Sequence, residues 1–192
     1  MKKMLALVLA LVMVMSMAAC TPNNNDATTE STTESTNAVV AADALEVLNT
    51  VWAAMPEEGQ FPCGGGNGDN MSMEGPGVVD LTDTDYLANV VHVPAELHAQ
   101  IVGAASMMHM MNSNTFTGAA YQITGDMAAF TTALTEGIKN TQWICGFPEK
   151  VLVATVGDYV VAVFGLGDLV DIFQTQLTTA YETAVVVVNE AL

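Results

Sequence analysis

Residues 150–164 read KVLVATVGDYVVAVF, and this stretch decides the fold. Two runs rich in β-branched and aromatic residues, 150–156 and 159–164, flank the dipeptide Gly157-Asp158. Such runs favour strands, and a two-residue turn containing glycine joins neighbouring strands in a hairpin. The stretch therefore predicts an antiparallel pair of strands.

The same pattern occurs once more upstream, and a helix is predicted after each pair of strands. The further elements are strands 105–111 and 115–123 around the turn Asn112-Ser113-Asn114, helix 127–142 capped by Asp126, and a last helix opened by Asp168. The order strand, strand, helix, strand, strand, helix is typical of the α+β class. We expect a four-stranded antiparallel sheet covered by helices on one face.

The segment before residue 105 predicts additional N-terminal helices and a long loop. Leu45, Leu48, Trp52 and Met55 form one apolar stripe, which indicates a helix over 43–55. Residues 60–80 contain six glycines and two prolines, so they predict a loop that is either mobile or fastened by Cys63. Two short helices are expected next, one capped by Asp83 and one starting at Pro94. The valine-rich tail 184–192 predicts either an extension of the last helix or an edge strand.

Several spaced motifs resemble a known family. They are Tyr121-Gln122-Ile123, Trp143 with Pro148-Glu149-Lys150, Val156-Gly157-Asp158-Tyr159-Val160-Val161, and Ile172-Phe173. Together they are similar to an uncharacterised lipoprotein domain family of Gram-positive, clostridial-type bacteria, over about residues 106–177. This chain departs from that family by lacking basic residues along helix 127–142. The resemblance implies an α+β lipoprotein domain outside the cytoplasmic membrane, and it implies no activity.

The N-terminus has the pattern of a bacterial lipoprotein precursor. Met1-Lys2-Lys3 is basic, and the uncharged apolar run 4–19 is shorter than the roughly 20 residues that span a bilayer. Met17-Ala18-Ala19-Cys20 resembles the lipobox, in which the cysteine is acylated with chains such as palmitate and the peptide is cut just before it. We predict a signal peptide over 1–19 and a protein anchored to the cell membrane through Cys20, on the extracytoplasmic face.

The rest of the mature chain divides by composition. Residues 20–40 comprise the acylated Cys20 and a segment rich in Thr, Ser and Asn, which predicts a disordered tether. Residues 41–192 predict a single α+β domain. Without residues 1–19, two lysines stand against 21 acids, which is a formal charge of −19, and there is no arginine. This charge excludes nucleic acid as a partner and keeps the domain away from anionic lipids.

Two cysteines remain beyond the anchor, Cys63 and Cys145. An even pair in an oxidising compartment predicts a disulfide, and the alternative is two buried free thiols. The bond would close a loop of about 80 residues and contribute on the order of 4 kcal/mol.

Two groups of residues are candidate metal ligands. In a strand, Met107, His109 and Met111 share one face, and thioether and imidazole ligands suit Cu(I); Met71 and Met73 lie in the glycine-rich loop that would close over them. The alternative is that methionine simply fills the core. The second group supplies oxygens for Ca²⁺, and it comprises Asn67, Asp69, Asp80, Asp83 and Asp85.

No catalytic constellation is recognisable in the sequence. His92 and His98 are six residues apart, no Gly-x-Ser-x-Gly elbow is present, and the cysteines do not form a Cys-x-x-Cys pair. We therefore predict a non-enzymatic surface lipoprotein without a cofactor, which binds an envelope protein or a small ligand. The alternatives are a metal-handling lipoprotein for Cu(I) or Ca²⁺ and a cell-envelope hydrolase.

Overall fold

The computed structural model describes residues 41–192, so the predicted signal peptide, the acylated Cys20 and the tether lie outside the described residues. The helices are α1 (Ala44–Ala54), α2 (Thr84–Asn89), α3 (Met127–Lys139) and α4 (Gly167–Ala180), with 3₁₀ turns η1 (Glu57–Gly59), η2 (Gly68–Asn70), η3 (Ala95–Gln100) and η4 (Ser113–Thr115). The strands are β1 (Cys63–Gly64), β2 (Gly77–Val78), β3 (Ile101–His109), β4 (Phe116–Ile123), β5 (Lys150–Val156), β6 (Tyr159–Gly165) and β7 (Ala184–Ala191).

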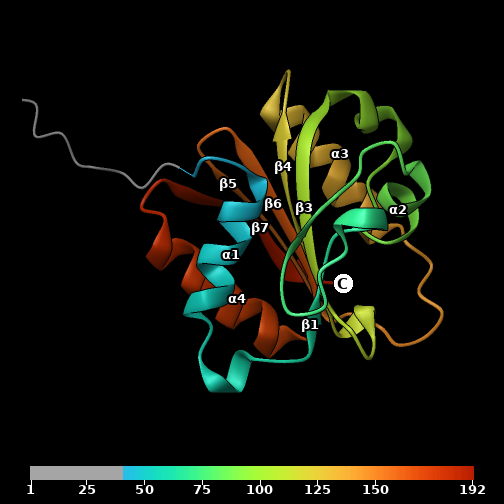
Figure 1. The fold of residues 1–192 in the computed structure, drawn as a ribbon. Coiled ribbons are helices and arrows are strands. Elements are labelled where there is room, and N and C mark those ends of the chain that lie inside the picture. The colour runs from blue at the N-terminus through green and yellow to red at the C-terminus, as the bar shows by residue number, and fades with distance from the viewer. Residues whose placement is uncertain (1–40) are drawn as a thin grey trace, which may run out of the picture. The chain divides into compact units, whose positions relative to one another are not determined.

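The strands form one antiparallel sheet in the order β1-β3-β4-β6-β5-β7, and β2 also pairs with β3 (Figure 1). The α+β class is as predicted, and the four expected strands are β3 to β6 at the centre of the sheet. The predicted number of four strands is wrong, because the sheet has seven. Two-residue strands from the glycine-rich loop join one edge, and the valine-rich tail joins the other as β7 rather than extending α4.

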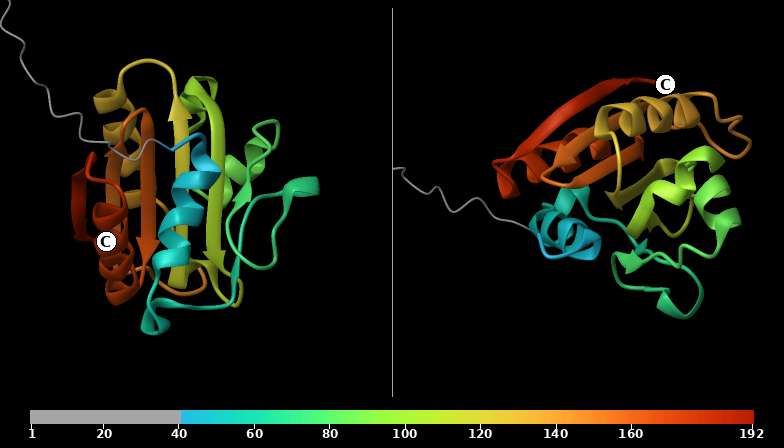
Figure 2. Two further views of the ribbon diagram at one scale, coloured as in Figure 1. Left: turned by 60° about the vertical axis from the view of Figure 1, so that its left-hand side comes forward. Right: turned by 90° about the horizontal axis from the view of Figure 1, so that it is seen from above.

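Helices cover both faces of this sheet rather than one (Figure 2). The core on one face is built with α1 and α4, and the core on the other face with α2, η3 and α3. The reason lies in the central strands, where successive residues are buried whichever way they point: all seven residues of β6 and the first six of β4 are buried. A strand that is buried on both sides must be covered twice.

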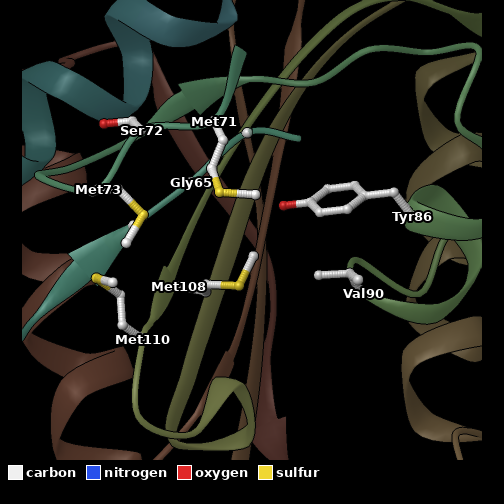
Figure 3. A pocket seen from close by; sticks show the side chains of 10 residues that line it. Gly65, Met71, Ser72, Met73, Tyr86, Val90, Met108 and Met110 are labelled. Atoms are coloured by element: carbon white, nitrogen blue, oxygen red, sulfur yellow. The ribbon is translucent and has the colours of Figure 1, made fainter. Parts of the chain in front are cut away.

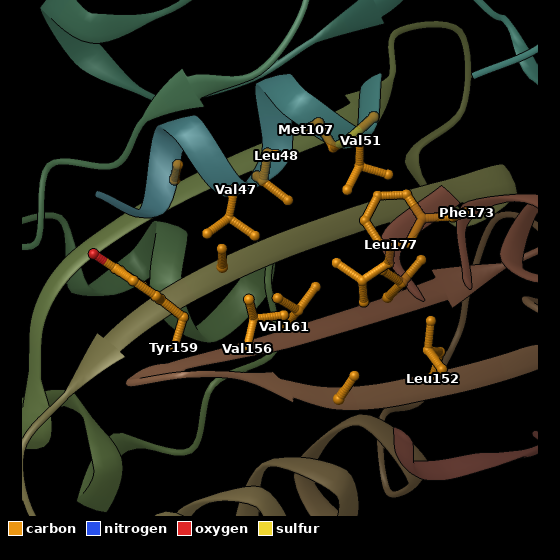
Figure 4. Close-up of a cluster of buried hydrophobic side chains, with 14 of the residues drawn as sticks. Val47, Leu48, Val51, Met107, Leu152, Val156, Tyr159, Val161, Phe173 and Leu177 are labelled. Carbon is orange, nitrogen blue, oxygen red and sulfur yellow. The ribbon is translucent and has the colours of Figure 1, made fainter. Parts of the chain in front are cut away.

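The face under α1 and α4 has a dense aliphatic and aromatic core (Figure 4). Val47, Leu48 and Val51 of α1 meet Phe173 and Leu177 of α4 over the sheet, and all five are fully buried. Each such side chain contributes roughly 1.5–3 kcal/mol by leaving water. This core fixes β3 and β4 in place, and it therefore positions the part of β3 that carries the methionines.

Side-chain caps confirm three of the predicted helix starts, whereas α4 begins at Gly167 without a side-chain cap and has Asp168 in its first turn. The carboxylates of Asp43, Asp83 and Asp126 accept backbone N–H groups at the first turns of α1, α2 and α3. Such caps each contribute about 1 kcal/mol. The segment after Pro94 is a 3₁₀ helix instead of an α-helix. None of the helices formed by residues 41–192 is long and apolar enough to span a bilayer.

Candidate functional site: a methionine-lined pocket

The glycine-rich loop folds back onto β3 and brings three extended segments side by side. Gly64 pairs with Met108 of β3, and on the other side Gly65 pairs with Ser72 through two backbone hydrogen bonds of 3.0 and 2.8 Å. The glycine segment 64–66 therefore lies between β3 and the segment 71–73. The loop is thus fastened by backbone pairing, and Cys63 contributes to it only as a residue of β1.

The pairing sets which side chains share a face. Successive residues of an extended strand point to opposite sides, so Met71 and Met73 flank Ser72 on the side toward which Met108 and Met110 also point. The glycines between these two pairs have no side chains. The result is an open pocket of about 310 Å³ whose floor is the glycine segment and whose walls are thioethers.

Figure 3 shows how the pocket is arranged. The sulfur-bearing ends of Met71 and Met73 face those of Met108 and Met110 across the glycine segment, and the Tyr86 side chain of α2 points its hydroxyl into the same space. Val90, the residue that follows α2, completes that side. We call this site the methionine pocket. Met71, Met73 and Met110 are exposed by 62%, 60% and 42%, so the pocket opens to solvent.

The glycine floor is required by close backbone contacts. A Cβ at Gly65 would lie 2.0 Å from the carbonyl oxygen of Ser106 and 2.7 Å from the backbone nitrogen of Gly77. Gly66 has a φ of +69°, a conformation that side chains rarely adopt, and its N–H donates to Ser106 Oγ at 2.9 Å. At Gly64 a Cβ would approach Met110 Cγ to 3.2 Å, so the absence of a side chain there leaves the space that the methionine occupies.

A small polar group closes the inner end of the pocket. Tyr86 OH lies 2.7 Å from Ser106 Oγ, which also accepts from Gly66. Burial is the main cause that raises the pKa of Tyr86, so its hydroxyl is neutral at physiological pH. Tyr86 is the one ionisable side chain in the lining of the methionine pocket.

Met107 and His109 lie on the same side of β3, as the sequence predicts, but Met111 is not part of the strand. Met107 is fully buried in the core under α1 and α4, and the His109 ring stacks on Phe61 with centroids 5.2 Å apart. Met111 lies beyond the end of β3 and is 81% exposed. The loop methionines Met71 and Met73 do face β3, but they lie opposite Met108 and Met110, which alternate along the chain with the predicted trio.

The acidic residues that were candidates for Ca²⁺ are used to hold the loop. Asn67 is buried and accepts from the Asp80 backbone N–H at 2.6 Å, while its amide donates to Asp83 Oδ2 at 3.1 Å. The other oxygen of Asp83 caps α2 through Tyr86 N. Asp80 accepts from the hydroxyl and the N–H of Thr82, which lowers the pKa of this carboxyl.

The two remaining candidates, Asp69 and Asp85, are exposed. Within residues 41–192, no group of three or more His, Cys, Asp or Glu side chains is placed to hold a metal ion. The oxygens of Asn67, Asp80 and Asp83 are thus used to hold the loop and to cap α2.

The predicted disulfide is absent, and both Cys63 and Cys145 are free thiols. Cys63 is 4% exposed and belongs to the core under α1 and α4. Cys145 is exposed on the loop between α3 and β5, where its carbonyl accepts from the Asn114 side chain at 3.2 Å. An even number of cysteines fitted the expected compartment, but it carried no information about which face of the sheet each one occupies.

The sequence contained a signal for the methionine pocket that was not recognised. Met71 and Met73 are two apart, as are Met108 and Met110, and the run Gly64-Gly65-Gly66 precedes the first pair. Spacing of two marks one face of an extended segment.

Comparison of the chain with protein-family models, with curated proteins and with solved structures found no match. The resemblance to a clostridial-type lipoprotein family therefore stays a prediction.

Proposed function

We propose that this chain is a non-enzymatic binding protein of the bacterial cell envelope, held on the extracytoplasmic face through acylated Cys20, and that the methionine pocket is its binding site. The observation that carries the proposal is the pocket itself. Its volume of about 310 Å³ lies in the range of small-ligand sites, and its lining is apolar apart from the hydroxyl groups of Ser72 and Tyr86.

The lining favours binding over catalysis. Thioethers and a valine offer no proton to transfer, the Ser72 hydroxyl has no histidine or carboxylate beside it in the lining, and burial raises the pKa of the Tyr86 hydroxyl. Such a surface gains free energy by covering apolar atoms that are now exposed to water. Methionine also adapts its shape to an occupant, since it has three rotatable bonds and a polarisable sulfur.

The frame of the pocket is rigid on two sides. Met108 belongs to β3, which is paired with β4 along most of its length, and the glycine segment is paired on both edges. Met71 and Met73, by contrast, lie on the short extended segment between η2 and β2, which pairs with the glycine segment at a single bridge, Gly65 with Ser72. A fixed wall facing an adaptable one lets a ligand enter without disturbing the sheet.

The uncharged fluorophore N-phenyl-1-naphthylamine tests the binding site. Titration of the full-length protein in detergent is expected to show saturable binding at one site. Gly64→Val, which fills the floor beneath Met110, and Val90→Trp, which enlarges the side chain just after α2, are each expected to weaken binding by about tenfold or more, as loss of a good apolar contact does. Gly103→Ala, on β3 but outside the pocket, is the control.

Non-saturable binding to the wild-type protein would contradict the proposal. Wild-type affinity in both filled variants, with circular dichroism spectra that match the wild type, would also contradict it.

The anchor has a separate test. Cys20→Ala is expected to move the protein from the membrane fraction to the soluble extracytoplasmic fraction, and a variant that stays equally membrane-bound would remove the lipid from the proposal.

A further inference from the structure

Four of the five aliphatic side chains that line the methionine pocket are methionines. They come in two pairs, Met71 with Met73 and Met108 with Met110, on two extended segments that are separated only by the glycine segment. Adjacent strands are about 4.8 Å apart, so the two pairs start roughly 10 Å from each other and their side chains meet over the middle segment. Figure 3 shows the thioether ends turned toward this common space.

We infer that the methionine pocket binds a Cu(I) ion through the thioether sulfurs of Met71, Met73, Met108 and Met110. This inference rests on the proposed function, because it names the ligand of the same pocket. Thioethers are soft, neutral donors that select Cu(I) over hard cations such as Mg²⁺ and Ca²⁺, which require oxygen ligands. The pocket lining contains no carboxylate that would serve those ions.

Stronger copper ligands near the pocket face away from it. Cys63 and His109 pair with each other across β1 and β3, and both side chains lie on the α1 and α4 side of the sheet. The site is therefore built from thioethers alone.

The charge of the protein favours a cation in the pocket. The whole chain carries a formal net charge of −17. Both lysines of residues 41–192 are in ion pairs, Lys139 with Glu190 and Lys150 with Asp171, and neither lines the pocket. A negative field of this kind raises the local concentration of cations and offsets part of the cost of dehydrating one.

A site made only of thioethers has a distinctive pH dependence. Thiol and imidazole ligands must lose a proton before they bind a metal, so their metal affinity falls as the pH is lowered. A thioether has no proton to lose. Affinity for Cu(I) is therefore expected to stay constant between about pH 5 and pH 8, provided that the fold is intact over that range.

Anaerobic titration of the full-length protein with Cu(I), against the chelator bicinchoninate, tests the inference. We expect one ion per chain with a Kd below about 1 µM. The double variant Met108→Leu with Met110→Leu keeps volume and apolarity but removes two sulfurs. It is expected to lose affinity by at least about 100-fold, since even residues behind the ligands of a metal site are worth about tenfold or more each. The matched control is Met107→Leu with Met111→Leu, which also removes two sulfurs from the same run of the chain.

A second readout identifies the ligands directly. With methionine labelled by ¹³C at its methyl group, Cu(I) is expected to shift the NMR signals of the four pocket methionines and to leave Met55 and Met107 in place, because both lie in the core under α1 and α4. Shifts that are confined to other methionines would overturn the inference.

The Cu(I) titration and the N-phenyl-1-naphthylamine titration together distinguish failure of the inference from failure of the proposed function. Saturable binding of N-phenyl-1-naphthylamine without Cu(I) binding would overturn copper as the ligand and leave the pocket as a binding site. Absence of both would overturn both. Cu(I) affinity that falls steeply with pH, or that survives the Met108→Leu and Met110→Leu changes, would assign the metal to other residues.

Discussion

His92 has the only non-glycine backbone with positive φ among residues 41–192, at +53°. A left-handed backbone costs a residue with a Cβ roughly 1–2 kcal/mol, so neighbouring contacts must hold it there. The ring packs edge-on against Trp143, with centroids 4.8 Å apart, and against Phe164 at 5.3 Å. The turn before η3 is therefore held by the packing of the ionisable His92 ring against Trp143 and Phe164.

His92 makes stability depend on pH. Burial lowers its pKa from the ordinary value of about 6.5, so the folded state favours the neutral ring. The unfolded chain then binds more protons just below pH 6.5, and the free energy of unfolding falls as the pH is lowered through the folded pKa. The test is urea denaturation at pH 7.5 and at pH 5. Asparagine tolerates the left-handed backbone, so His92→Asn keeps the turn without the ionisable ring. Its free energy of unfolding is expected to fall less between the two pH values than that of the wild type.

His98→Gln is the control for this measurement. The His98 ring is hydrogen-bonded to the Val93 carbonyl rather than enclosed by aromatic side chains. If His92→Asn and the wild type lose the same free energy between the two pH values, burial of His92 is not the cause.

At Gly65, the absence of a single atom, the Cβ, is important for stability. Its missing Cβ lets the glycine segment approach the backbone of Ser106 and Gly77. Gly65→Ala is expected to lower the free energy of unfolding by more than about 2 kcal/mol, because backbone atoms must shift. Gly103→Ala on β3 would meet only ordinary contacts with Gln122 and is expected to change stability by less than about 0.5 kcal/mol. Equal effects in chemical denaturation would contradict the packing of the loop.

At the scale of elements, the glycine-rich loop is the clearest difference between expectation and structure. Its composition predicted a segment that was either mobile or fastened by a cysteine. Instead, β1 and β2 pair with β3, and the side chain of Asn67 bonds to the backbone of Asp80 and to Asp83. Glycines permit this because strand pairing and close approach need only backbone atoms.

The valine-rich tail shows how strand geometry resolves an ambiguous pattern. Ala184 to Ala191 pairs with β5 as an edge strand, and its residues alternate in exposure. Val186 packs against the core under α1 and α4, whereas Val185 is 59% exposed. Four consecutive valines carry no alternation in the sequence, so only pairing with β5 assigns each one to a side.

Adjacent valines of β7 should therefore respond differently to a charge. Val186→Lys places an ammonium against apolar side chains and is expected to lower the free energy of unfolding by about 2 kcal/mol or more. Val185→Lys leaves its charge in water and is expected to change stability by less than about 0.5 kcal/mol. Thermal unfolding of both variants provides the measurement, and a reversed order would mean that the register of β7 differs by one residue.

At the scale of the whole molecule, two layers of helices enclose the sheet and separate the thiols. Cys63 lies in one core, and Cys145 lies on the exposed loop that follows α3 on the other face. In a Cys20→Ser variant, iodoacetamide at pH 8 is expected to modify Cys145 quickly and Cys63 only after unfolding. The raised pKa of Cys63 and its burial both act in that direction. Unfolded, unreduced protein in which neither thiol reacts would instead establish a disulfide.

The sequence alone predicted most of the local structure of residues 105–180, although β3 runs over Ile101–His109 rather than 105–111. The strands on either side of Gly157-Asp158 and the cap at Asp126 were predicted correctly, and α3 ends three residues earlier than expected. These features depend on propensity, turn chemistry and capping, which act over a few neighbouring residues. The continuous apolar runs of β5 and β6 also contained the signal for helices on both faces, because alternation is missing when both sides are buried.

Only the tertiary structure decided which methionines form a site. Met107 and Met108 are neighbours in the sequence, yet one fills the core and the other lines the methionine pocket. A strand exposes alternate residues to opposite faces, so the choice depends on which long-range partners lie on each side. Pairing of Gly64 with Met108, across 44 positions of chain, makes that choice. Spacing of two groups the methionines by face, but it does not say which face is covered by the core, because the energy that selects the register comes from burying both faces at once.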